Sequence, residues 1–94
     1  MKTIKLTDAE KVLLRAADYI EEYGWCQGRS VAPHGVCAMH AIMVCSCGPA
    51  ESAIHELERR IGRRVVFWND DPARTREEVL ATLRQVAGGT DPAR

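Results

Sequence analysis

Two short segments combine a tryptophan with hydrogen-bonding side chains: Trp25-Cys26-Gln27 and Trp68-Asn69-Asp70. An indole is a flat apolar wall, and a few fixed amide or carboxylate groups beside such a wall are typical of a small-ligand pocket. If the two segments meet in the fold, we expect these six residues to line a ligand-binding site. The alternative is structural, with the indoles closing the ends of a helical bundle and Asn69 and Asp70 capping a turn.

A metal site is a second hypothesis. His34, Cys37 and His40 follow one another at intervals of three residues, and zinc accepts thiolate and imidazole ligands. However, the sequence lacks a paired C-x-x-C motif, and Cys37 and His40 fall in a segment that the pattern predicts to be buried. We therefore expect no cofactor and interpret the cysteines as small core residues, with zinc at these three residues as the alternative.

Cys26 is also a candidate nucleophile, because His34, Asn69 and Asp70 supply the partner types that thiol hydrolases use. A catalytic cysteine is helped by the positive N-terminus of a helix, whereas Cys26 follows a predicted helix C-terminus, whose dipole raises a thiol pKa. We therefore expect a non-enzymatic protein. A small cysteine-dependent or metal-dependent enzyme is kept as the alternative.

The charge balance argues against nucleic acid as a partner. Thirteen basic and thirteen acidic residues cancel, whereas phosphate binding requires a net or clustered positive field. The basic residues in 59–64 gather at a predicted helix C-terminus, where cations are favoured in any case. No apolar run reaches the roughly 18 residues of a membrane span, and the polar start does not resemble a signal peptide. We expect a cytoplasmic protein with no membrane contact, in which the four cysteines are reduced.

Four helices are predicted to position these residues. Thr7-x-x-Glu10 and Thr75-x-x-Glu78 are capping boxes that open the first and last helices. The first helix is expected over about residues 8–23 and ends at Gly24. Another begins after Gly48-Pro49 and ends at Gly62, and the last ends at 88–89.

The remaining segments complete the predicted fold. Residues 36–47 are apolar almost all round, which predicts a buried central helix, and residues 25–35 have the composition of a loop. The β-branched and aromatic run at 65–68 predicts a short extended segment. The sequence therefore predicts a mainly α, compact four-helix domain over residues 1–89, with a frayed tail at 90–94.

The order of these motifs resembles a family. Gly24-Trp25-Cys26-Gln27-Gly28, then Val36-Cys37-Ala38, then Trp68-Asn69-Asp70 and the closing 75–80 helix are similar to a domain of unknown function found in bacteria and their phages. Compared with that pattern, the loop between Gly28 and Cys37 is short, and His40 stands where a small residue is expected. The resemblance implies a shared fold and brings no activity with it.

Taken together, these features favour a non-enzymatic accessory protein of a bacterium or phage that binds an unidentified protein partner or small molecule. A homodimer that acts as an interaction module is a further alternative, because small chains often complete their core by self-association.

Overall fold

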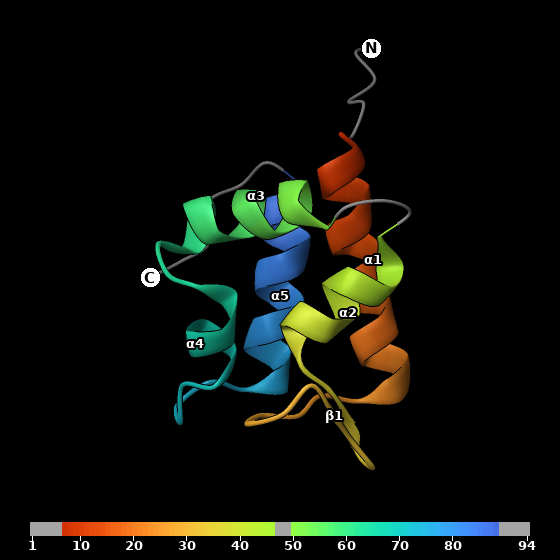
Figure 1. Cartoon of the computed structure of the whole chain (residues 1–94), viewed down its shortest axis with the longest axis vertical. Helices are drawn as coiled ribbons and strands as arrows, with labels where there is room; N and C mark the ends of the chain where they lie inside the picture. The colour runs from red at the N-terminus through yellow and green to blue at the C-terminus, as the bar shows by residue number, and fades with distance from the viewer. Residues whose placement is uncertain (1–6, 47–49, 89–94) are drawn as a thin grey trace.

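The computed structural model describes residues 7–46 and 50–88. Its elements, in chain order, are α1 (Asp8–Tyr23), β1 (Val31–Ala32), β2 (Gly35–Val36), α2 (Ala38–Cys45), α3 (Glu51–Ile61), α4 (Val65–Asn69) and α5 (Arg76–Ala87). Helices α1 and α5 run side by side, α3 lies across one end of this pair, and α4 packs against α2 and α3 (Figure 1). The mainly helical class is confirmed, but the described residues form five helices and a small hairpin where four helices were predicted.

Helix α1 carries a buried apolar stripe. The Thr7 amide donates to Glu10 Oε1 at 2.8 Å, and the Glu10 amide donates to Thr7 Oγ1 at 3.1 Å, so the predicted capping box is present. Its apolar stripe is buried and consists of Val12, Leu13, Ala16, Ala17 and Ile20. Because α1 packs against α5, α2 and α3, this stripe carries the shared core.

The start of α5 and the end of α3 are also set by residues close to them in the sequence, as predicted. The Thr75 amide donates to Glu78 Oε1 at 3.1 Å, and the Glu78 amide donates to Thr75 Oγ1 at 3.2 Å, which forms the second capping box. Gly62 ends α3 at a φ of 74°, a left-handed conformation that glycine adopts without a steric penalty.

Helix α2 is shorter and more exposed than predicted. Its residues Ala38, Ala41 and Ile42 are buried, whereas Met43 and Val44 are 59% and 49% exposed. The prediction of a buried central helix over 36–47 is therefore wrong for the described part of that segment. An eight-residue helix that packs through one face leaves the side chains of its other face outside the core, whatever their polarity.

The segment predicted to be extended at 65–68 is helical. Helix α4 begins after Arg64, and Glu58 Oε2 accepts the Val65 amide at 2.9 Å. The Trp68 amide then donates to the Arg64 carbonyl at 2.9 Å. A β-branched run with no neighbouring strand must satisfy its buried backbone groups in another way, and a helical turn does so locally.

The predicted loop at 25–35 contains a hairpin that the sequence did not indicate. Strands β1 and β2 pair antiparallel, and Trp25 bridges to Val36 on β2. The Val36 amide donates to the Gly24 carbonyl at 3.1 Å, and the Cys26 amide donates to the Val36 carbonyl at 3.1 Å. Gly24 has a φ of 94°, and a Cβ there would lie 2.1 Å from the His34 carbonyl oxygen, so only glycine permits this approach.

No helix of the described residues is both long and apolar enough to cross a membrane. Three sequence expectations lie outside the described residues: Cys47 at the end of the apolar segment, the start of the next helix at 48–49, and the tail at 90–94.

Candidate functional site

Asn69 joins the two tryptophan-containing segments through all four of its side-chain hydrogen-bonding positions. Its Oδ1 accepts from Trp25 Nε1 at 2.7 Å and from the Ala38 amide at 3.0 Å. Its Nδ2 donates to the Cys26 carbonyl at 3.1 Å and to Asp70 Oδ1 at 2.9 Å. The side chain is 1% exposed, so this amide bonds α4 to the loop after α1 and to the first turn of α2.

Gln27 and Gly28 extend the same contact. Gln27 Nε2 donates to the backbone carbonyls of Asn69 at 2.9 Å and Asp71 at 2.7 Å. The Gly28 amide donates to Asp70 Oδ1 at 3.0 Å. The two segments therefore meet, as the pocket hypothesis requires, but most of their polar groups bond to one another.

The two tryptophans are positioned differently from each other. Trp68 is 4% exposed and belongs to the core, with the Arg74 guanidinium 5.0 Å from its ring centroid. Trp25 is half-buried and packs on the edge of that core. Neither indole lines the hollow that lies beside the Asn69 network.

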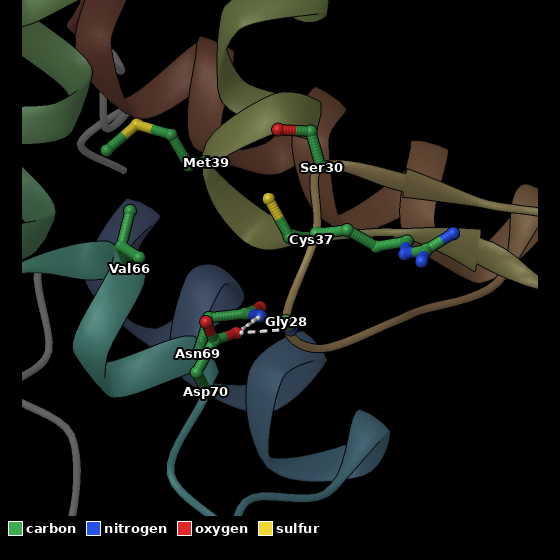
Figure 2. Close-up of a pocket in the computed structure, with 8 residues that line it drawn as sticks. Gly28, Ser30, Cys37, Met39, Val66, Asn69 and Asp70 are labelled. Carbon is green, nitrogen blue, oxygen red and sulfur yellow. Dashed lines mark hydrogen bonds between the residues drawn. The ribbon is translucent and has the colours of Figure 1, made fainter.

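A hollow of about 140 Å³ opens between α2, α4 and the loop before β1. Figure 2 shows Met39 and Val66 at one end, Cys37 and Ser30 at another, and Asn69 with Asp70 between α4 and the loop. Its lining is Gly28, Arg29, Ser30, Cys37, Met39, Val66, Asn69 and Asp70. Of the six predicted ligand-binding residues, Asn69 and Asp70 are at this hollow.

Two polar groups of the hollow are available to a ligand. The Asp70 carboxylate uses Oδ1 for Gly28 and Asn69, which leaves Oδ2 without a hydrogen bond inside the described chain. The Ser30 hydroxyl also has no hydrogen-bond partner in residues 7–46 and 50–88. The hollow thus presents one carboxylate oxygen and one hydroxyl beside an apolar end, and the arginine side chain extends away from it (Figure 2).

The Cys26 thiol does not have the properties of a nucleophile. Its side chain is 2% exposed, and Sγ lies 3.3 Å from the Arg29 carbonyl oxygen as a hydrogen-bond donor. Burial raises the pKa of the Cys26 thiol, and the nearby Cys37 raises it further. The thiol is therefore protonated at neutral pH, whereas a nucleophilic cysteine requires the thiolate.

The three candidate metal ligands are divided between different roles. His34 is exposed in the turn between β1 and β2, and His40 is half-buried within α2. Cys37 caps α2, with its Sγ accepting the His40 amide at 3.3 Å. Within the described ranges, no group of three His, Cys, Asp or Glu side chains is arranged to hold a metal ion.

Sequence reasoning missed an apolar surface at one end of the hollow, which we call the α2–α4 patch. Met39 and Val66 both line the hollow, and Met43 follows Met39 by one helical turn on the same face of α2. Val44 and Phe67 are also exposed on these two helices, and Phe67 is 64% exposed. The patch consists of Met39, Met43 and Val66. The sequence signal for this patch was the apolar run at 36–47, which has no polar face and was predicted to form a buried helix.

A family model matches residues 5–88, and the chain belongs to that family, a family of unknown function (DUF6197). No curated protein and no solved structure matches the chain. The family membership agrees with the resemblance inferred from the tryptophan-containing motifs, and it carries no activity.

Proposed function

We propose that this member of the DUF6197 family is a non-enzymatic binding protein. Its α2–α4 patch receives an apolar group that belongs to a protein partner or to a small ligand. The observation that carries this proposal is that the hollow has an apolar end formed by Met39 of α2 and Val66 of α4, with the exposed Met43 one helical turn from Met39.

The distribution of exposed hydrophobic residues supports an interaction surface. Six large hydrophobic side chains are exposed in the described residues, and four of them lie on α2 and α4: Met43, Val44, Val66 and Phe67. Single exposed hydrophobic residues are ordinary, but Met43 and Val66 adjoin or line the apolar end of the hollow, and an exposed apolar surface beside a hollow is typical of a binding site. Each Å² of apolar surface removed from water contributes about 25 cal/mol, so covering this surface favours association.

The polar groups of the hollow would orient the ligand. Ser30 and Asp70 offer a hydroxyl and a charged acceptor, which suit the carbonyl and amide groups of a peptide. An apolar side chain would occupy the end at Met39 and Val66, and the adjoining backbone would contact Ser30 and Asp70. This arrangement favours a peptide segment with an apolar side chain over a wholly apolar molecule.

The chemistry of the cysteines supports a non-catalytic role. The pKa of Cys26 is raised by burial, and Cys37 is used as a helix cap, so neither residue is poised for nucleophilic attack. Cys26, Cys37 and Cys45 are free thiols, which suits the cytoplasm expected from the sequence.

Nuclear magnetic resonance with a defined probe tests the proposal. N-acetyl-leucine methylamide carries an apolar side chain on a peptide backbone, and N-acetyl-glutamate methylamide is its charged counterpart. We expect the leucine probe to shift the methyl signals of Met39 and Val66 in a saturable way, and the glutamate probe to leave them unchanged.

A matched pair of variants locates the binding. Val66→Lys changes a residue of the hollow that is 45% exposed, and Val31→Lys changes a residue on β1 that is 52% exposed. Loss of the shifts in Val66→Lys but not in Val31→Lys would support the proposal. Equal shifts from both probes, or equal effects of both variants, would refute it.

A further inference from the structure

We infer that Cys26 and Cys37 form a disulfide bond when the protein is oxidised, so that this pair is a reversible redox-modification site. Cys37 caps α2 and lines the hollow, so the bond would couple both to the redox state of the surroundings. The inference concerns the cysteine pair alone and does not depend on the proposed binding function.

The backbone register places Cys26 beside Cys37. Trp25 forms a parallel bridge with Val36, and the Cys26 amide donates to the Val36 carbonyl at 3.1 Å. The next pair in this register is Cys26 with Cys37. Paired residues of neighbouring strands lie about 4.8 Å apart and direct their side chains to the same face, and a disulfide joins Cα atoms about 4.4–6.8 Å apart. The register therefore meets the spacing that a disulfide requires.

Hydrogen bonds hold the two segments together on both sides of the pair. Before it, the Val36 amide donates to the Gly24 carbonyl at 3.1 Å. After it, the Cys26 carbonyl accepts from Asn69 Nδ2 at 3.1 Å, and the Ala38 amide donates to Asn69 Oδ1 at 3.0 Å. The buried Asn69 amide thus links the two segments where the next backbone hydrogen bond of the ladder would lie. The backbone is already in place, and the cysteine side chains must turn for the sulfur atoms to bond.

The sulfur of Cys26 lies close to the backbone of Cys37. Cys26 Sγ is 3.3 Å from the Arg29 carbonyl oxygen and 3.9 Å from the Ser30 carbonyl oxygen, and the Cys37 amide donates to this same Ser30 oxygen at 2.9 Å. Burial raises the pKa of Cys26, and the neighbouring Cys37 raises it further, which agrees with two sulfur atoms that are near each other. Cys45, by contrast, is the last residue of α2, at the opposite end of the helix from Cys37.

The oxidation is balanced with glutathione disulfide as the oxidant. Cys37 lines the hollow, so its thiol attacks first: a mixed disulfide forms, and one glutathione leaves with the Cys37 proton. The Cys26 thiol then attacks Cys37 Sγ, and the second glutathione leaves with the Cys26 proton. Two protein thiols become one disulfide, and one glutathione disulfide becomes two thiols. Because burial keeps Cys26 protonated at neutral pH, the second step is slow, and the test must reach equilibrium.

Peptide mapping after equilibration tests the inference. The full chain is equilibrated at neutral pH with rising ratios of glutathione disulfide to glutathione, both folded and unfolded in urea, and is then quenched with acid. Cleavage after Arg29 and after Met39 separates Cys26 from Cys37, and both from the two later cysteines. We expect the two resulting peptides to be joined by a disulfide that dithiothreitol removes. The folded chain should form this link at a ratio at least about tenfold lower than the unfolded chain.

Matched serine variants identify the pair. Cys45→Ser should leave the link unchanged, whereas Cys37→Ser should abolish it and leave Cys26 reduced. Serine keeps an acceptor for the His40 amide, so Cys37→Ser preserves the cap of α2, and circular dichroism establishes that both variants are folded.

Three outcomes would overturn the inference. The first is a folded chain in which Cys26 stays reduced while the other thiols carry glutathione. The second is a link from Cys26 to Cys45 or Cys47 in place of Cys37. The third is equal formation of the link in the folded and unfolded chains.

Discussion

Replacing Asn69 by alanine should destabilise the protein strongly, although no charge and little hydrophobic volume is lost. The substitution removes four hydrogen bonds at once. The Trp25 indole is half-buried and can turn to water, but the Ala38 amide and the Cys26 carbonyl belong to buried residues and would lose this partner. A buried polar group left unpaired costs about 1–3 kcal/mol. We therefore expect a loss of about 3–4 kcal/mol in the free energy of unfolding.

This loss is large for a chain of 94 residues. Natural domains of this length have a free energy of unfolding of about 5–14 kcal/mol. Urea denaturation followed by tryptophan fluorescence measures the change directly, with Gln85→Ala on the exposed side of α5 as a control expected to change stability by less than about 0.5 kcal/mol. A loss below about 1 kcal/mol for Asn69→Ala would refute the view that this amide holds the two segments together.

Asn69→Asp separates hydrogen bonding from volume. The variant keeps Oδ1 but places an acceptor where Nδ2 donates to the Cys26 carbonyl and to Asp70. Burial and the neighbouring Asp70 should raise the pKa of the new carboxyl above its unfolded value of about 3.9. Its destabilising effect is then present at neutral pH and disappears as the pH falls towards the unfolded pKa. Asn69→Asp should regain stability relative to the unaltered protein on acidification, and Asn69→Ala should not.

Three further outcomes are expected. Gly24→Ala should lower the free energy of unfolding by about 2–3 kcal/mol, because its Cβ would lie 2.1 Å from a backbone oxygen. Gly62→Ala, with nothing within 4 Å of the new Cβ, should lower it by less. Equal losses in the two variants would contradict the steric argument. Arg84 lowers the pKa of Glu21 in the folded protein. The contribution of this pair to folding stability is therefore present above the unfolded pKa of Glu21 and is lost as the pH falls below it. The difference in stability between Glu21→Gln and the unaltered chain should vanish in acid. Cys26, buried and with a raised pKa, should resist iodoacetamide at neutral pH until the chain unfolds, and rapid labelling of the folded protein would restore the enzyme alternative.

Local signals in the sequence were reliable where a structure depends on neighbouring residues alone. Thr7 with Glu10, and Thr75 with Glu78, form their capping boxes within one helical turn, so no distant contact can change the outcome. Gly62 likewise ends α3 by its own backbone conformation.

Predictions that depend on neighbours distant in sequence were less reliable. Residues 65–68 have a strand-like composition, but in the described part of the chain no strand pairs with them, and they form α4, whose first amide is accepted by Glu58. The apolar run at 36–47 predicts burial, yet Met43 and Val44 are exposed because α2 packs through one face. The hairpin at 31–36 depends on a close approach of Gly24 to the His34 carbonyl, which no local pattern indicates.

In the candidate site, too, some features could be predicted from local sequence and others depend on contacts between distant segments. The types of its residues indicated that Trp25, Gln27, Asn69 and Asp70 had a role beyond the helical core, because amides beside an indole need hydrogen-bonding partners. Composition could not tell whether those partners would be a ligand or one another. The fold brings α4 within 3.1 Å of the Cys26 carbonyl, and most of these groups then bond across the contact.

The sequence by itself determined the helical class, the ends of several helices and the family, because each depends on short-range chemistry or on the order of motifs. The tertiary structure alone decided that Asn69 is a buried connector and that a hollow lined by Met39 and Val66 is left beside it. The physical reason is that hydrogen-bond partners and solvent exposure are properties of pairs of segments. These segments lie some forty residues apart in the chain, and only folding places them in contact.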